Sequence, residues 1–289
     1  MKNIVIIIIL LINIQLITSQ EVKYAPAWFG PNANPVPEFT DATIVDKTTV
    51  QLMADYYFGF GDQTKNGYFK IDIPLLPGRV SFKIWTSLFE HYQVTDEVSL
   101  ERDMHGNTSG KANGDFYVQT RISILKEDTH KPAIILNSTL KTASGTNFTG
   151  RRYFDTPGYY FDVETGKSFM LNNQFLNEIR LVGNLGFLCW ETTNSTQNDA
   201  PVYGGKIILG NQHWKLENTL SGYYGWMHKH PQYVNNYGDA PLVFVTKLTY
   251  KLKNIDYFAQ YQYGIKDFPY HQIRFGVSFS INKLTPDFK

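Results

Sequence analysis

The stretch from Leu242 to Ile281 shows the clearest alternation of apolar and polar positions in the chain. Near its end, Ile273, Phe275 and Val277 occupy every second position, with polar or small residues between them. A period of two places successive side chains on opposite faces of a β-strand. The stretch therefore predicts three strands in close succession, each with one apolar face and one polar face.

The same period recurs along most of the chain from Thr48 onward. It predicts further strands over Thr49–Phe60, Tyr68–Ile73, Val80–Val94, Asp115–Lys126, Ala133–Thr142, Gly158–Ser168, Asn177–Trp190, Pro201–Gly210 and Lys215–Trp226. The total of about twelve is even, and most segments are near the ~10 residues of a membrane-crossing strand. Two folds fit such strands. In a soluble sandwich the apolar face meets a second sheet, and in a membrane barrel it meets lipid.

The lengths of the connections distinguish these two folds. Short connections fall near Pro74, Glu127, Phe169, Asn211 and Lys253, and mostly longer ones fall near Asp62, Thr95, Ala143, Glu191, His228 and Lys266. Outer-membrane barrels have short periplasmic turns and longer outer loops, whereas a sandwich has no reason for this alternation. We therefore predict an all-β fold, a twelve-stranded antiparallel transmembrane β-barrel over residues 48–289, with both termini on the periplasmic side.

The first residues predict export. Met1 and Lys2 give a short positive start, residues 4–17 are almost entirely aliphatic, and small or polar residues follow. This is the pattern of a secretory signal peptide, here residues 1–19, with cleavage after Ser19 or Gln20. The apolar run is shorter than the ~20 residues of a membrane-spanning helix. A signal peptide followed by a barrel predicts the outer membrane of a Gram-negative bacterium.

Residues 20–47 form a proline-rich N-terminal segment without sustained alternation. Proline lacks the backbone donor that a central strand needs, so an irregular or extended conformation is expected. Two interpretations remain open: a tail in the periplasm, or a plug in the barrel lumen. Trp28 and Phe29 favour the plug, because a tail would leave both aromatic side chains in water.

Strand parity directs many charged side chains to the lumen. The candidates for lining it are Lys83, Arg121, Lys141, Asp162, Glu164, Arg180, Lys247 and Arg274. One interpretation is a structural network of ion pairs that fills a narrow barrel, since buried charges require partners. The other is a cationic surplus that selects anionic solutes, as charged rings do in pores. The two interpretations are compatible.

Composition and motifs narrow the range of functions. The formal net charge is +1, and there is a single cysteine, so we expect neither a nucleic-acid partner nor an intramolecular disulfide. No nucleotide-binding or catalytic motif is present, and His228 with His230 makes only an isolated pair, so we predict no metal and no cofactor. The expected partners are membrane lipid and a small solute, and the sequence does not indicate an oligomeric state.

Residues 115–169 carry a resemblance to known families. The segment runs "FYVQTRISILKED", then Lys131-Pro132 before "AIILNSTLKTASG", then "YYFDVETGKSF". This order resembles outer-membrane barrels grouped with phenol-degradation transporters and, more distantly, long-chain fatty acid transporters. In those families the middle strand usually ends Lys-x-Pro-Thr-Gly, and the proline is missing here. The composition, rich in Asn, Ile and Lys, resembles barrels of Bacteroidota. The resemblance implies an outer-membrane transporter or porin.

We therefore expect a channel or transporter for a small solute that is anionic or amphipathic, and not an enzyme. One alternative is a lipid hydrolase embedded in the barrel, for which Ser87 and His91 share a predicted strand face. Four residues apart along a strand, they would lie ~13 Å from each other. The other alternative is a structural or adhesive barrel that transports nothing.

Overall fold

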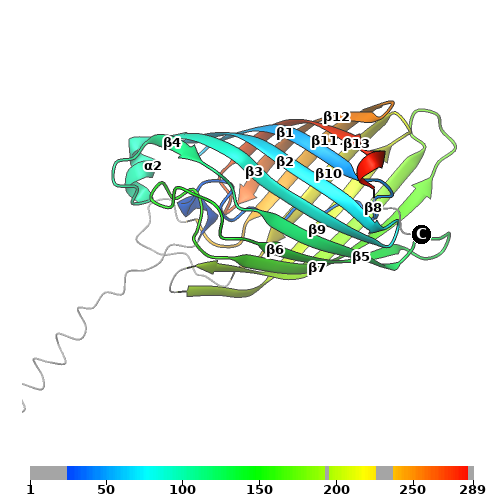
Figure 1. Ribbon diagram of the computed structural model, residues 1–289, viewed down its shortest axis with the longest axis horizontal. Helices are drawn as coiled ribbons and strands as arrows, with labels where there is room; N and C mark the ends of the chain where they lie inside the picture. The colour runs from blue at the N-terminus through cyan, green and yellow to red at the C-terminus, as the bar shows by residue number, and fades with distance from the viewer. Residues whose placement is uncertain (1–24, 193–194, 226–236, 286–289) are drawn as a thin grey trace, which may run out of the picture.

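The computed structural model describes residues 25–192, 195–225 and 237–285, which form a β-barrel (Figure 1). Its strands are β1 (Thr49–Phe58), β2 (Asp62–Leu76), β3 (Val80–Val94), β4 (Ser109–Ala112), β5 (Tyr117–Leu125), β6 (Ala133–Lys141), β7 (Gly158–Met170), β8 (Glu178–Thr192), β9 (Ser195–Gly210), β10 (Trp214–Tyr223), β11 (Leu242–Leu252), β12 (Ile255–Lys266) and β13 (His271–Ser280). The helical elements are short: η1 (Pro26–Trp28), α2 (Asp96–Glu101) and η2 (Asn282–Leu284). Among the described residues, no helix is long and apolar enough to span a bilayer.

The sheet closes on itself, and every pairing is antiparallel. β1 pairs with β2 on one side and with β13 on the other, and β3 pairs with both β2 and β5. The short strand β4 pairs only with β3. Without β4, the thirteen strands of the described sheet leave twelve that form the barrel. Closure leaves no free edge, which is what a sheet in lipid requires. The predicted twelve-stranded antiparallel barrel is confirmed.

Two predicted boundaries are wrong. β2 begins at Asp62, six residues before the predicted start at Tyr68, and it continues through an irregularity between Pro74 and Leu76. The residues from 191 to 200, predicted as a polar loop, belong mostly to β8 and β9, which pair as far as Thr192 and Ser195. Strand pairing outside the lipid needs no apolar face, so polar strand ends resemble loops in the sequence.

The two faces of the wall have opposite character. On β8, Leu181 and Leu185 point outward and are 46% and 70% exposed, while Arg180 and Asn184 point inward and are buried. The same alternation holds for Phe275 and Arg274 on β13. An apolar exterior around a polar interior is the inverse of a soluble protein and is typical of a barrel in lipid. The closed barrel and its apolar exterior place the protein in an outer membrane.

The ends of the barrel differ, although less sharply than predicted. At one end the five connections have at most seven residues each: 77–79, 126–132, 171–177, 211–213 and 253–254. At the other end β3 and β5 are joined by residues 95–116, which include α2 and β4, and β6 and β7 are joined by residues 142–157 (Figure 1). We call these the turn end and the loop end. Three loop-end connections are also short, residues 59–61, 193–194 and 267–270.

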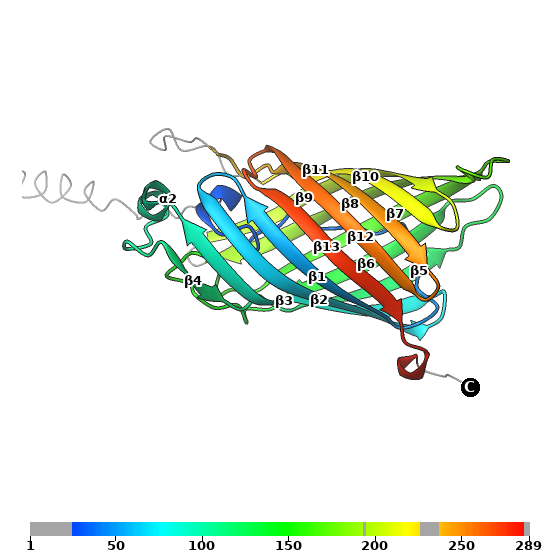
Figure 2. The same cartoon turned by 90° about the horizontal axis from the view of Figure 1, so that it is seen from above.

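The described part of the N-terminal segment, residues 25–47, passes through the barrel from the loop end to the turn end (Figure 2). Near its start, Gly30 donates from its backbone N–H to the carbonyl of Arg151, in the loop-end connection 142–157. At its finish, the carbonyl of Thr48 accepts from the N–H of Ile281, at the turn end of β13. We expected both termini on the turn side. The terminal residues, including the predicted signal peptide, lie outside the described residues, but Ala25 lies at the opposite end from Thr285.

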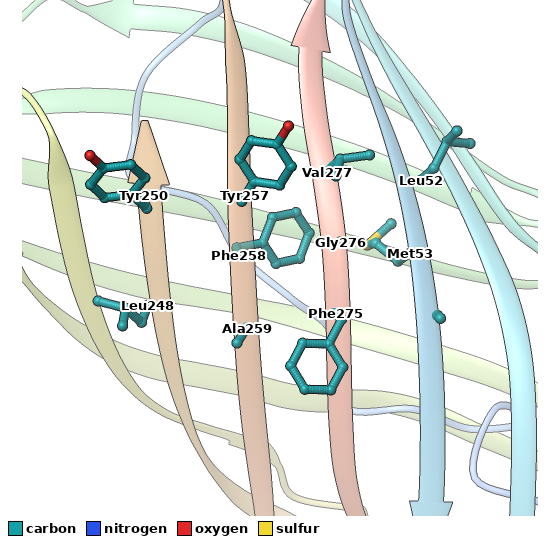
Figure 3. A pocket seen from close by; sticks show the side chains of 11 residues that line it. Leu52, Met53, Leu248, Tyr250, Tyr257, Phe258, Ala259, Phe275, Gly276 and Val277 are labelled. Atoms are coloured by element: carbon teal, nitrogen blue, oxygen red, sulfur yellow. The ribbon is translucent and has the colours of Figure 1, made fainter. Parts of the chain in front are cut away.

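A shallow hollow lies in the outer face over β1, β11, β12 and β13 (Figure 3). It has a volume of about 660 Å³ and is open to the lipid side. Its outward row places the small side chains of Ala54 and Ala259 on either side of Phe275. Two short side chains beside bulky ones explain the depression. An apolar hollow of this kind suits acyl chains of the bilayer, and the candidate site lies inside the barrel instead.

The opposite character of the two faces predicts the effect of a charge on the outer one. Leu185→Arg places a guanidinium near the middle of β8 on the lipid side and should reduce the free energy of unfolding by about 2–4 kcal/mol. Chemical denaturation in lipid vesicles measures it. The matched control is Leu100→Arg on α2, outside the wall, where the residue is 84% exposed and no loss is expected. Equal stability of the two variants would contradict the assignment of the outer face.

Candidate functional site

The N-terminal segment divides the lumen and leaves a cavity of about 430 Å³ beside it. The segment contributes residues 35–45 to the lining, with gaps. The remaining lining residues come from every barrel strand except β6, and from Phe268 in the loop-end connection 267–270. Ligand pockets for small molecules have volumes of this order. Because the segment belongs to no strand of the sheet, its position depends on contacts with the inner wall.

One wall carboxylate holds the middle of the segment. The Glu164 side chain on β7 accepts hydrogen bonds from the backbone N–H groups of Thr40, at 2.9 Å, and Ala42, at 3.1 Å. It also accepts from the Thr40 hydroxyl at 2.7 Å. Arg121 on β5 lies 3.0 Å from Glu164 and donates to the Thr43 carbonyl at 2.8 Å. The ion pair is buried, and it presents both an acceptor and a donor to the segment.

Three cationic side chains donate to alternate carbonyls of the segment. Lys206 on β9 reaches the carbonyl of Phe39 at 2.7 Å, and Arg180 on β8 reaches that of Asp41 at 2.7 Å. Arg121 binds the carbonyl of Thr43 in the same way. The carbonyls that these cations bind belong to residues that follow the last proline of the segment, Pro37.

Glu38 makes the contact between the segment and the opposite side of the wall. Its carboxylate lies 2.7 Å from Arg274 on β13 and 3.0 Å from Lys70 on β2. Arg274 also pairs with Asp55 on β1 through two bonds of 2.7 Å. The Asp55 side chain is fully buried, whereas that of Glu38 is 52% exposed.

A second network closes the loop end. Arg152 lies 2.8 Å from Asp62 and 2.5 Å from Glu90, and Arg102 lies 2.6 Å from Asp62. All four side chains have no exposed surface. Arg102 donates to the carbonyl of Ala27 at 3.1 Å, which ties the network to the start of the segment. The two arginines are neutralised by the two carboxylates, because charges buried away from water require partners.

Two further contacts complete the loop-end network. Asn32 donates from its side-chain amide to Glu90 at 2.6 Å. Tyr153 donates to the same carboxylate, and burial beside Glu90 raises the pKa of this phenol well above its usual value, so the hydroxyl stays protonated. Arg152 packs against Gly30 so closely that a Cβ there would lie 2.3 Å from the guanidinium carbon. A side chain at position 30 would therefore push the Arg152 guanidinium out of its place in the network.

The structure places the predicted lumen residues on the inner face. The buried ones are Lys83, Arg121, Lys141, Asp162, Glu164, Arg180 and Arg274, and Lys247 is half-buried. Lys141 pairs with Asp115 at 2.7 Å at the loop end, away from the middle of the lumen. Asp162 accepts from the amides of Asn137 and Asn184 and does not contact the segment. Their part in a solute path stays a prediction.

The two aromatic residues predicted for a plug are buried. Trp28 and Phe29 form a small cluster with Ala25 and Ala33 of the segment. The ring of Phe29 lies 4.0 Å from that of Phe154, which belongs to the loop-end connection 142–157. Tyr270 donates from its hydroxyl to the carbonyl of Phe29. Both side chains therefore cover the lumen at the loop end.

Ser87 and His91, the pair considered for a hydrolase, lie on opposite faces of β3. Tyr68 pairs with Ser87 and the preceding Gly67 pairs with Phe89, so Leu88 is an extra residue in the strand. This bulge reverses the parity beyond it. Ser87 is buried in the lumen, and His91 is exposed on the outside. The geometry gives no support to a nucleophile and base at these positions.

The same bulge hid an important residue from the sequence analysis. Strand parity without the bulge turns Glu90 outward, whereas the structure buries it in the loop-end network. Asp62, Arg102 and Arg152 were also missed as site residues because they lie in or near predicted loops. Loops have no regular alternation of side chains, so their sequence did not indicate which acidic residue would lie beside which basic residue. Within the described residues, no group of His, Cys, Asp or Glu is arranged to hold a metal, and His228 and His230 lie outside them.

The loop-end network predicts a large difference between two adjacent arginines. Arg152→Ala leaves Asp62 and Glu90 without a buried partner and should lower the free energy of unfolding by about 3–5 kcal/mol. Arg151→Ala is the matched control: its ion pair with Asp103 is partly exposed and its bond to the carbonyl of Arg102 leaves no buried charge behind, so the loss should be about 1–2 kcal/mol. Urea denaturation of both variants tests this, and equal losses would contradict the network.

Comparisons with known proteins give a fold but no family. No protein-family model matches the sequence, and no curated protein matches it. Among solved structures, the COG4313 outer membrane channel from Pseudomonas putida F1 is similar, with a TM-score of 0.57 and 10% identity. The match covers 86% of this chain and 100% of that one.

A second similar structure, the transport unit of the autotransporter AIDA-I from Escherichia coli, has a TM-score of 0.45 and 8% identity over 89% of this chain and 99% of that one. Of the two, the likeness to the COG4313 channel shows that the chain has the fold of an outer-membrane β-barrel.

Proposed function

We propose that this protein is an outer-membrane channel or transporter for a small anionic or amphipathic solute, and that the N-terminal segment is a plug in its lumen. The observation that carries the proposal is the path of the segment, which crosses the lumen outside the sheet and leaves a 430 Å³ cavity beside it. A barrel that served only as a scaffold could fill its interior with side chains of its own strands. The interior of this barrel instead holds the N-terminal segment, which is not part of the sheet.

The charges of the cavity support an anionic solute. Five cations line it, namely Lys70, Lys83, Arg121, Lys206 and Lys247. They are matched by five acids, namely Glu38, Asp41, Asp72, Glu217 and Asp256. Two of these acids, Glu38 and Asp41, belong to the segment. When the segment leaves, five cations face three acids on the wall, and a positive lumen attracts anions.

The contacts of the segment favour displacement over permanent filling. Most of its bonds to the wall are hydrogen bonds between charged wall side chains and backbone groups of the segment: cations donate to carbonyls, and Glu164 accepts from N–H groups. Water and solute can replace such bonds one by one once the cavity fills. The resemblance of residues 115–169 to phenol-degradation and fatty acid transporters supports the same proposal. A structural or adhesive barrel is the second candidate, and no specific observation favours it.

Deleting Ala25–Glu38 tests the proposal. The deletion removes the loop-end contacts of the segment and the Glu38 contact, while the wall keeps all its strands. We expect a folded barrel, shown by heat-modifiable migration in gels, with a higher single-channel conductance than the full chain in planar bilayers.

The control for this deletion is the same variant with a synthetic peptide of residues 25–38 added, which should lower the conductance again. If the folded deletion variant conducts no more than the full chain, the segment is not a plug. If it passes no solute in vesicles, the channel function is wrong as well.

A further inference from the structure

The contact between Glu38, Lys70 and Arg274 has the form of an occupied ligand site. One carboxylate lies between a primary amine at 3.0 Å and a guanidinium at 2.7 Å. Charge-assisted bonds of this length are the means by which proteins recognise carboxylates. Glu38 belongs to the N-terminal segment, which the proposed function requires to be displaced, whereas both cations belong to the wall.

The two carboxylates bound to Arg274 differ in how firmly they are held. Asp55 takes two bonds from Arg274, one from Gln272 and one from Asn66, and its side chain is fully buried. Among the described residues, Glu38 bonds only to Lys70 and Arg274, and half of its side chain is exposed. Without Glu38, two cations would face the single acid Asp55. Lys70, Arg274 and Asp55 together therefore carry one net positive charge, which one exchangeable carboxylate can neutralise.

An apolar wall lies beside this site. The Trp85 and Tyr117 rings are stacked, with centroids 5.1 Å apart and an angle of 8° between their planes. The Lys70 amine lies 6.0 Å from the centre of the Trp85 ring, and the Arg274 guanidinium lies 4.9 Å from the centre of the Tyr68 ring. All three aromatic residues line the cavity. A molecule with its carboxylate at the cations could place a flat apolar body against them.

Tyr117 gives a second indication of a ligand. Its side chain lines the cavity and is 6% exposed, yet its hydroxyl has no hydrogen-bond partner among the described residues. A buried hydroxyl without a partner is costly. A polar atom of a bound solute could satisfy it.

We propose that Lys70 and Arg274 form a carboxylate subsite for an amphipathic carboxylate with a flat apolar body, and that Glu38 is its built-in occupant. The solute carboxylate takes the place of the Glu38 carboxylate, so no buried cation loses its partner during the exchange. Solute binding thereby removes one of the contacts that hold the segment in the lumen. This inference rests on the proposed function for its biological meaning, but the binding itself can be tested separately.

The experiment measures binding of benzoate, and of benzamide as its uncharged analogue, to the full chain in detergent micelles by titration calorimetry. Glu38→Gln removes the competing charge at nearly constant volume and should raise the affinity for benzoate at least tenfold, with benzamide unchanged. Glu97→Gln on the exposed helix α2 is the matched control and should change neither. Glu38→Ala serves as a second variant, with the same expected gain.

Adding Lys70→Met to Glu38→Gln should abolish the gain. The subsite is wrong if Glu38→Gln and Glu38→Ala, both folded, bind benzoate no better than the full chain. It is also wrong if benzamide gains equally, because the substitution would then only open space. These outcomes are separate from channel function. If the deletion variant conducts but the Glu38 variants gain no affinity for benzoate, the subsite is wrong and the channel function stands. If the Glu38 variants gain affinity but the deletion variant does not conduct, the channel function is wrong and the subsite stands.

Discussion

Water cannot reach the polar interior of this barrel through its wall, because lipid surrounds the outside. Every inward charge must therefore find its partner inside. The wall alone satisfies part of this demand, for example where Arg274 pairs with Asp55 and Arg121 with Glu164. The N-terminal segment satisfies much of the rest, by offering carbonyls to Arg121, Arg180 and Lys206 and N–H groups to Glu164. The folded interior is thus the joint product of the wall and the segment.

This dependence explains why the segment is rich in proline. Proline fixes the backbone angle φ at about −65° and has no N–H group. A strip of chain that crosses a charged lumen without a neighbouring strand has few acceptors for its donors. Proline at positions 26, 31, 35 and 37 removes donors, and the N–H groups of Thr40 and Ala42 find the Glu164 carboxylate. The same property keeps the segment from joining the sheet as another strand.

Most of the wall could be predicted from the sequence, because a period of two decides which side chains face lipid and which face the lumen. The limits lie where the period breaks or is absent. The extra residue at Leu88 reversed the parity of β3, which hid Glu90 and wrongly joined Ser87 to His91. Arg102 and Arg152 lie in loops, where burial depends on tertiary contacts that leave no periodic signal. The direction of the segment, from the loop end to the turn end, also depends on those contacts.

Amide hydrogen exchange can decide whether the wall charges hold the segment in the lumen. In the full-length protein in micelles, the N–H groups of Thr40 and Ala42 should exchange slowly, at rates close to those of the barrel strands. In a Glu164→Gln variant the two amides should exchange much faster, while the strands remain protected. Rapid exchange of both amides in the unmodified protein, with the barrel folded, would mean that the wall charges do not hold the segment in the lumen.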